Sequence, residues 1–454
     1  MFSHSVCIKA TTYKKVTDSM GIKRTLKAIL ILGVLGAGGF VPYDAHAQSS
    51  RPECQMNPEK VIKLGMPVFG GYLKWKRSIA QPEDALGQDR LIRVFDNIDN
   101  FVVIGEHKSA DTNATFIQVI QMDYNGLVLG SVQKDLKTFG RIIDVINHDD
   151  KIIVLLEKMA GDGVRHTEIK VFSEKGEAIR SKILKTDTHV IMPSAITVGT
   201  DGALYVATQH KHKKQFRDVY SVLYKLNDKM KVMWKRSFLP STPTRIHALI
   251  TRADGGFLAA GEIAVPGGRK RQRIGGWLMA LSEQGGMEWQ RSYPRGYNSR
   301  LNFIHETKNK FIFTAGTAYP SGDGNASAWI MTNNANSNPV WQRYFSGKYA
   351  YKSIGLQVSD DEQTTLVLQG TPVKNAGANH VRLLSLSQLG YVMNDRSYIE
   401  GAGVEGHGIV SFKNPTLGRY IIGSAEMPST EDNNHILDGW IASIHKARKN
   451  NLCR

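Results

Sequence analysis

Cysteine is nearly absent from this chain, with three residues in 454. Three are too few for a disulfide scaffold or a cysteine zinc site. Long apolar runs are also scarce: only residues 28–41 form one, and they fall short of the ~20 residues that span a bilayer. A sustained helical period is missing beyond that run. No GxSxG, HExxH, P-loop or EF-hand pattern is present, so no local motif names a reaction.

The N-terminus carries the features of an export signal. A basic stretch at residues 23–27 precedes the apolar run, and Ala45 and Ala47 place small residues where a signal peptidase cleaves. We predict a signal peptide over residues 1–47, with Met20 as an alternative start. The exported chain is then periplasmic or secreted and keeps no transmembrane anchor. We expect Cys54 and Cys453 to form a disulfide in that oxidising compartment; two free thiols are the alternative.

Acidic residues are few relative to basic ones, with 41 Asp+Glu against 58 Lys+Arg and a net charge of +17. Residues 1–47 hold six basic and two acidic residues, so the exported chain keeps a charge of +13. This excess favours an anionic partner such as an acidic glycan or a phosphate-bearing polymer. A generally basic proteome would produce the same balance without any specific partner.

A unit of roughly fifty residues repeats along the chain. Tryptophan followed by Lys-Arg or Gln-Arg recurs at Trp234, Trp289 and Trp341, with an earlier copy at Trp75, and Asn394 replaces it in a later one. Each unit contains four short apolar segments separated by turn residues, for example 245–250, 257–262, 276–281 and 287–293. Four strands in a repeat of this length are typical of a β-propeller blade.

The units can be counted from the residue that opens each innermost strand. These residues are Arg90, Arg141, Pro193, Arg245, Arg300, Lys352 and His407. The last unit supplies only three strands, and residues 72–79 at the N-terminus supply the fourth. We therefore predict an all-β fold, a seven-bladed β-propeller of four-stranded blades closed by an N-terminal strand. It spans residues 71–444, between an N-terminal extension at 48–70 and a tail at 445–454, and we expect a monomer.

The segment GWLMALSEQGGMEWQRSY at residues 276–293 places Gly285 and Trp289 at the spacing of a tryptophan-docking motif. In this respect the chain resembles secreted bacterial propellers of the quinoprotein-like (PQQ-repeat-like) superfamily, although Met279 and Leu281 depart from the motif's Ala and Asp. The resemblance covers most of residues 71–444 and implies the fold. It does not imply a quinone, because the quinone dehydrogenases of that superfamily have eight blades and a vicinal cysteine pair. We expect no cofactor.

Six of the seven opening residues are basic or potentially basic. The first residues of innermost strands lie at one rim of a propeller's channel, on the face that also carries the loops between second and third strands. Those loops are basic at residues 158–166, 210–217 and 269–273, so the positive patch should be lopsided. We predict a ligand-binding rim formed by Arg90, Arg141, Arg245, Arg300, Lys352 and His407. Pairing of the arginines with carboxylates such as Asp89 and Asp144 is the alternative.

Signals for metal binding and catalysis are weak. His210 and His212 lie in a basic loop without a neighbouring carboxylate cluster, so we predict no metal site. His247 lies two residues beyond Arg245 and is the candidate for a general base facing the channel. A histidine packed in the core or at the rim is the alternative.

Two functions are consistent with this pattern. The first is binding of an anionic polysaccharide or an acidic protein partner at the basic rim; nucleic acid is not expected. The second is lyase or hydrolase action on an acidic glycan at the same rim, with His247 near Arg245 and Arg300. Whether the protein is an enzyme stays open, and so does a scaffold role in which the rim has no ligand.

Overall fold

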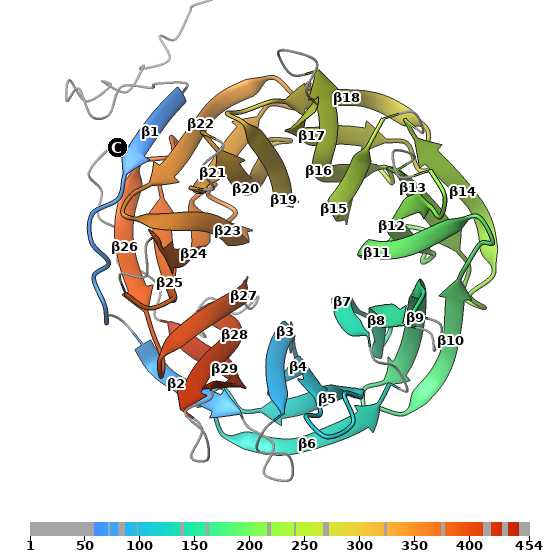
Figure 1. Cartoon of the computed structure of the whole chain (residues 1–454), viewed down its shortest axis with the longest axis horizontal. Helices are drawn as coiled ribbons and strands as arrows, with labels where there is room; N and C mark the ends of the chain where they lie inside the picture. The colour runs from blue at the N-terminus through green and yellow to red at the C-terminus, as the bar shows by residue number, and fades with distance from the viewer. Residues whose placement is uncertain are drawn as a thin grey trace, which may run out of the picture. The chain divides into compact units, whose positions relative to one another are not determined.

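The computed structural model describes residues 59–70, 73–79, 87–97, 99–136, 140–159, 163–215, 219–239, 242–266, 272–321, 325–373, 377–411, 419–428 and 435–444. Its named elements are all β-strands, and they form seven sheets arranged in a ring (Figure 1). The prediction of an all-β, seven-bladed propeller is confirmed.

Six blades are built from four consecutive strands, numbered from the channel outwards. Blade 1 contains β3 (Gln88–Asp96), β4 (Phe101–Lys108), β5 (Thr115–Met122) and β6 (Val128–Asp135). Blade 2 contains β7 (Arg141–His148), β8 (Lys151–Met159), β9 (Arg165–Ser173) and β10 (Ala178–Leu184). Blade 3 contains β11 (His189–Val198), β12 (Leu204–His212), β13 (Val219–Leu226) and β14 (Val232–Phe238).

Blade 4 contains β15 (Thr244–Thr251), β16 (Phe257–Pro266), β17 (Gln272–Leu281) and β18 (Met287–Tyr293). Blade 5 contains β19 (Asn298–Glu306), β20 (Ile312–Tyr319), β21 (Ser327–Asn333) and β22 (Pro339–Ser346). Blade 6 contains β23 (Tyr349–Val358), β24 (Thr364–Pro372), β25 (His380–Leu386) and β26 (Val392–Tyr398).

Blade 7 closes the ring by joining the two ends of the propeller. Its inner strands are β27 (Gly403–Ser411), β28 (Arg419–Pro428) and β29 (His435–Ile444), and its outer strand is β2 (Leu73–Ile79). Strand β2 pairs antiparallel with β29, from Leu73 opposite Ile444 to Ile79 opposite Gly439. The predicted closure by an N-terminal strand is therefore confirmed, and it removes the open sheet edges that a broken ring would expose.

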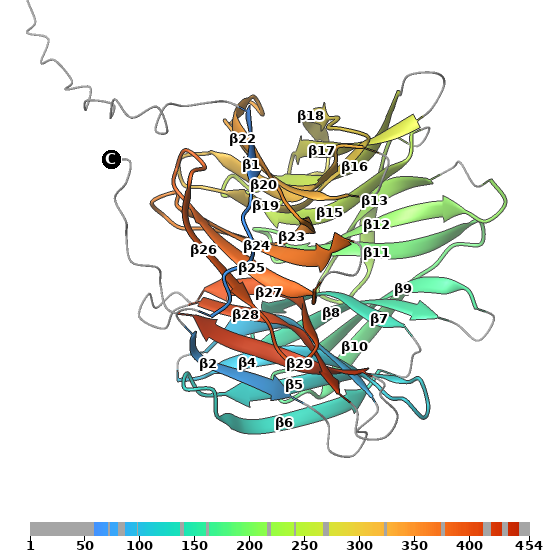
Figure 2. The same ribbon diagram turned by 60° about the vertical axis from the view of Figure 1, so that its left-hand side comes forward.

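An additional strand before β2 runs along the outer wall. Strand β1 (Glu59–Lys63) pairs in parallel with β22 and makes blade 5 five-stranded. The chain then crosses blade 6, where the carbonyl oxygen of Val68 accepts a hydrogen bond from the backbone N–H of Ser397, and continues to β2 (Figure 2). Cys54, Cys453 and the signal segment lie outside the described residues, so the disulfide and the cleavage site stay predictions.

Where the repeated tryptophan is present, it packs against a turn of the next blade. Gly285, in the last turn of blade 4, has a φ of +74°, and a Cβ there would come within 2.5 Å of the Trp234 ring of blade 3. Trp75 and Trp341 lie against Gly126 and Gly390 in the same way. The arginine that follows two residues later also reaches that turn: Arg77 donates from Nε to the Gly126 carbonyl at 3.1 Å. These residues are therefore structural.

The register assigns the same docking position to Gly130, Arg180 and Asn394 in blades 1, 2 and 6. A tryptophan at position 394 would have no turn to pack against in the neighbouring blade 7. That blade takes its outer strand from the N-terminus, so no turn connects its third and fourth strands. A second set of tryptophans fills the core between blades. These are Trp277, Trp329 and Trp440, each about 1% exposed or less.

Candidate functional site

The inner strands of all seven blades begin on one face of the ring, which we call the mouth face. The opening residue of an inner strand is paired in register with a residue near the end of the second strand. The pairs are Arg90–Glu106, Arg141–Glu157, Arg245–Glu262, Arg300–Thr317 and Lys352–Gln369. Five of the six predicted basic residues therefore occupy equivalent positions. Three of them face a glutamate.

Two blades differ from the predicted alignment. The register places Met192, not Pro193, at this position in blade 3, and Glu405, not His407, in blade 7. His407 instead occupies a β-bulge two residues further along the strand. Loop lengths vary between blades, so counting residues from one unit to the next does not preserve the register. The ring therefore carries one acidic residue where a basic one was expected.

The facing glutamates escaped prediction, although each follows its arginine by 16 or 17 residues. The carboxylates considered from the sequence have other partners. Asp89 is 3% exposed and accepts a hydrogen bond from Gln118 at 2.7 Å, with Nδ1 of His107 3.0 Å away. Asp144 forms an ion pair with Arg93.

Arg90 and Glu106 join blade 1 to blade 2. The Nη2 atom of Arg90 lies 3.2 Å from the Glu106 carboxylate and donates to the carbonyl oxygen of Ile142 at 2.6 Å. The same carboxylate accepts a hydrogen bond from the backbone N–H of Ile142. Arg90 is thus engaged in holding two inner strands together, and its guanidinium is only partly available to a ligand.

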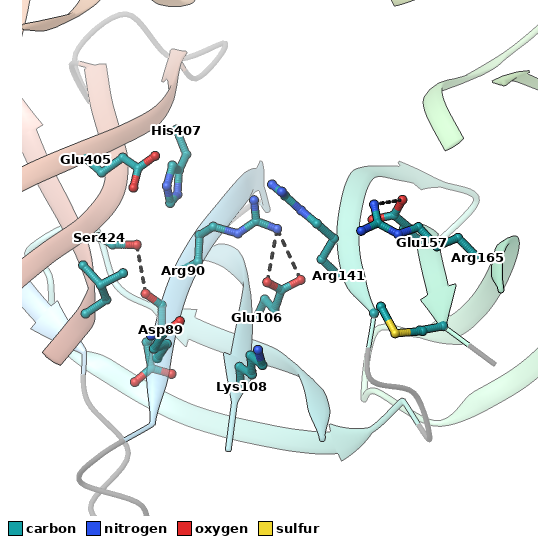
Figure 3. Close-up of a pocket in the computed structure, with 14 residues that line it drawn as sticks. Asp89, Arg90, Glu106, Lys108, Arg141, Glu157, Arg165, Glu405, His407 and Ser424 are labelled. Carbon is teal, nitrogen blue, oxygen red and sulfur yellow. Dashed lines mark hydrogen bonds and ion pairs between the residues drawn. The ribbon is translucent and has the colours of Figure 1, made fainter. Parts of the chain in front are cut away.

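Arg141 differs from Arg90 in both exposure and contacts. Its side chain is exposed, points toward Arg90 and makes no hydrogen bond or ion pair with the described residues (Figure 3). Its charge lowers the pKa of His407 on one side of the mouth and of Arg245 on the other, in each case after the larger effect of burial. Arg141 therefore presents a positive charge without an ion-pair partner among the described residues, at the channel rim between blades 1 and 2.

A pocket of about 540 Å³ surrounds Arg141 where blades 7, 1 and 2 meet, and we call it the mouth pocket. Arg165 lies 3.2 Å from Glu157, while Lys108 is exposed (Figure 3). Both cationic and acidic side chains line the pocket. Its charged lining residues are Asp89, Arg90, Glu106, Lys108, Arg141, Glu157, Arg165 and Glu405. Cations and carboxylates are equal in number, so the pocket is polar and mixed rather than uniformly basic.

His407 adds no charge to the mouth at neutral pH. Its Nδ1 atom donates to the carbonyl oxygen of Leu91 at 2.9 Å. Burial, with the nearby charge of Arg90, lowers the pKa of His407 to about 4. The imidazole is therefore neutral and links blade 7 to blade 1.

Blades 4 and 5 contribute a more buried cluster. Burial lowers the pKa of Arg245, and its Nε atom has no hydrogen-bond partner among the described residues. The Nε2 atom of His247 lies 3.4 Å from the Glu262 carboxylate, in an alignment that makes no hydrogen bond. Burial lowers the pKa of His247 as well, so this imidazole is neutral. Arg300 donates to the hydroxyl of Tyr319 at 3.3 Å.

The last mouth-position residue and the predicted loop residues differ in exposure. Lys352 is exposed, as are Lys211, Lys213 and Lys214 in blade 3. His210 is buried against Tyr224 at 3.0 Å, and Nδ1 of His212 accepts two backbone N–H groups. Within the described ranges, no group of three metal-ligating side chains converges. Residues 217 and 269–271 of the predicted basic loops are outside the described residues.

Comparisons with known proteins give no family. No family model matches the chain, and no curated protein matches it. A protein of unknown function from Dyadobacter fermentans is 11% identical, with 68% of this chain and 94% of that chain covered and a TM-score of 0.42. The hemagglutinin-neuraminidase ectodomain of parainfluenza virus 5 is 8% identical (84% and 87% covered, TM-score 0.43), and puromycin hydrolase is 12% identical (80% and 63% covered, TM-score 0.39). These likenesses concern the fold alone. Among the described residues, none forms a helix long and apolar enough to cross a membrane.

Proposed function

We propose that this protein binds an acidic polysaccharide at the mouth face of its propeller. The observation that carries the proposal is Arg141, an exposed guanidinium inside a pocket and without a partner among the described residues. A carboxylate of the ligand supplies the missing anion, since guanidinium and carboxylate form strong charge-assisted hydrogen bonds. The exposed Lys108 of blade 1 and Lys352 of blade 6 add positive charge to the mouth face.

The mixed charge of the pocket favours a glycan over other polyanions. Ionised carboxylates such as Glu157 and Glu405 only accept hydrogen bonds. A sugar offers hydroxyl donors to them, whereas a polyphosphate offers none and is repelled. A uronate polymer combines carboxylates for the arginines with hydroxyls for the glutamates. Export to the periplasm or beyond, predicted from residues 1–47, would give the protein access to such polymers.

Titration of residues 48–454 with polygalacturonate and polymannuronate, and with neutral dextran, tests the proposal. We expect both uronate polymers to bind, more weakly as salt screens the charges, and dextran not to bind. The variant Arg141→Gln/Lys352→Gln should weaken binding about tenfold or more, because it removes two charge-assisted contacts.

The matched control is Lys229→Gln/Lys235→Gln, which removes two exposed lysines from the turn after β13 and from β14, away from the mouth. It loses the same net charge and should bind like the wild type. If both double variants bind equally, net charge alone governs the association and the mouth is not the site.

A second candidate function is uronate cleavage with His247 as the base. The neutral imidazole beside Glu262, with Arg245 and Arg300 influencing its pKa, favours this possibility. A base next to cations that neutralise a carboxylate suits proton abstraction from the adjacent carbon. Appearance of unsaturated uronate absorbance, abolished by His247→Ala while binding persists, would establish it. Binding without absorbance would leave a binding protein.

A further inference from the structure

A second pocket opens on the mouth face between the neighbouring blades 4 and 5 (Figure 1), with a volume of about 340 Å³. We call it the tyrosine pocket, after Tyr297 and Tyr319 in its lining. Arg300, at the mouth position of blade 5, and Glu262 of β16 line it as well. It shares no lining residue with the mouth pocket, which lies where blades 7, 1 and 2 meet. Its volume falls within the roughly 300–1,000 Å³ of small-molecule sites.

Arg300 lines this pocket with much of its guanidinium unused. Its Nη2 atom donates to the Tyr319 hydroxyl at 3.3 Å, and its Cζ atom lies 5.8 Å from the centre of the Tyr319 ring. Unlike Nε of Arg245, no nitrogen of Arg300 is both buried and without a hydrogen-bond partner among the described residues. The nitrogens other than Nη2 are therefore accessible, and a ligand can reach their N–H donors.

The charges around Arg300 leave room for an anion. Glu262 is paired in register with Arg245 and also lines the tyrosine pocket. Although its burial opposes ionisation, the contact with His247 and the charges of both arginines lower its pKa, so it is ionised at neutral pH. One carboxylate thus lies beside two guanidinium groups and a neutral imidazole. The carboxylate of a ligand would balance the second guanidinium.

Tyr297 adds an aromatic ring to the same pocket. The residue is 42% exposed, and the pocket is lined by it. Its backbone is fixed independently of the ring: Gly296 precedes it with a φ of +60°, and the Tyr297 N–H donates to the carbonyl oxygen of Tyr319 at 2.7 Å. The ring is therefore held at the pocket by a rigid backbone while much of its surface meets solvent.

The equivalent connection into blade 7 shows that the fold does not require a tyrosine at this position. There Gly401 has a φ of +55°, and the N–H of Ala402 donates to the carbonyl oxygen of Glu426, again at 2.7 Å. Alanine thus serves the same backbone arrangement, and the mouth position that follows three residues later is Glu405. The tyrosine and the arginine of blade 5 are a combination that the backbone alone does not explain.

An acidic sugar has the chemistry that this pocket offers. The face of an aromatic ring is electron-rich and attracts the polarised C–H groups on one face of a sugar. A guanidinium pairs with a carboxylate, while an ionised glutamate accepts hydrogen bonds from hydroxyls. A uronate unit presents all three groups on one ring.

We infer that the tyrosine pocket is a second subsite, which holds one uronate unit with its ring on Tyr297 and its carboxylate on Arg300. The inference rests on the proposed function and adds that the polymer is held at two separate pockets of the mouth face. Two linked contacts strengthen binding beyond either one alone, because the second forms within a chain that is already bound.

Calorimetric titration of residues 48–454 with polygalacturonate and polymannuronate tests the second subsite. For the polymer that binds, Tyr297→Ala should bind about tenfold more weakly through loss of the ring contact. Arg300→Gln should bind about 10- to 100-fold more weakly and with a smaller salt dependence, since it removes a charge. Tyr297→Ala should keep the salt dependence of the wild type. Tyr297→Phe keeps the ring and should recover most of the affinity that Tyr297→Ala loses.

The control Leu129→Ala removes another exposed apolar side chain, from the outer strand β6, and should bind like the wild type. Melting temperatures confirm that each variant is folded, and Tyr297→Ala should melt close to the wild type because its side chain is exposed. If Tyr297→Ala binds the polymer like the wild type, or if Tyr297→Phe binds as weakly as Tyr297→Ala, the second subsite is overturned and the proposed function stands. If neither polymer binds the wild type, the proposed function and this inference both fail.

Discussion

The imidazole of His407 in blade 7 donates a hydrogen bond to the carbonyl oxygen of Leu91 in blade 1, at 2.9 Å. The two residues are 316 positions apart in the chain and meet only because the ring closes. The hydrogen bond requires a proton on Nδ1. The imidazole stays neutral beside Arg90 because its other nitrogen, Nε2, carries no proton. Closure is thus reinforced at the channel as well as at the outer strand β2.

Acidification should weaken the fold through His407. Its pKa in the folded protein is about 4, below the ordinary 6.5, so folding favours the neutral form. The contribution of neutral His407 to the free energy of unfolding is fully present above about pH 6.5. It is lost as the pH falls from 6.5 toward 4, and the loss is at most ~3 kcal/mol. Urea unfolding at pH 7 and pH 4.5 should show a smaller acid loss in His407→Gln than in the wild type. His166→Gln should lose as much as the wild type; equal losses in all three proteins would contradict the assignment.

Glu106 should matter more for stability than its counterpart Glu157. Glu106→Ala leaves both the Arg90 guanidinium and the N–H of Ile142 without their carboxylate, and should cost about 2–4 kcal/mol. Glu157 lies 3.2 Å from the exposed Arg165, and a pair of this kind contributes about 1 kcal/mol or less. Denaturant midpoints of the two alanine variants measure the difference. Equal midpoints would show that Glu106 does not hold blades 1 and 2 together.

Gly285 should tolerate alanine poorly, because a Cβ would come within 2.5 Å of Trp234. We expect Gly285→Ala to destabilise the protein by about 2–4 kcal/mol, combining steric overlap with the left-handed backbone. Gly202→Ala is the matched control: its φ is +73°, yet nothing lies within 4 Å of the new methyl group. It should cost only about 1 kcal/mol. Similar melting temperatures for the two variants would argue against tight docking.

The repeat made the fold accessible from the sequence. Trp75, Trp234 and Trp341 recur because each packs against a turn of the next blade, so the same local requirement appears several times along the chain. The strand bounds expected for blade 4 agree with β15 to β18 within a few residues. The closing strand was also predictable, since Trp75 carries the motif that the last unit lacks. Strand β1 was not, because residues 59–63 pair with β22 through backbone hydrogen bonds that need no repeated side-chain pattern.

The candidate site was only partly accessible. The spacing of the repeat located the arginines at the mouth position. In blades 3 and 7 the prediction was off by one and two residues, because Met192 and Glu405 occupy the positions expected for Pro193 and His407. Loop lengths differ between blades, so spacing in the sequence does not fix the strand register. The β-bulge that follows the mouth position was missed altogether. His247 stood out as a histidine, but a bulge that it shares with Ser194 and Asn302 is a property of paired strands.

By itself, the sequence determined the number of blades, the closure of the ring and the recurrence of basic residues at its inner strands, since repetition amplifies each weak local pattern. Only the tertiary structure decided which charges remain available. It neutralises Arg90 with Glu106, turns His407 into a neutral link and leaves Arg141 exposed. The reason is that ion pairs and hydrogen bonds depend on the distances between side chains of different blades. The order of residues in the sequence does not give these distances.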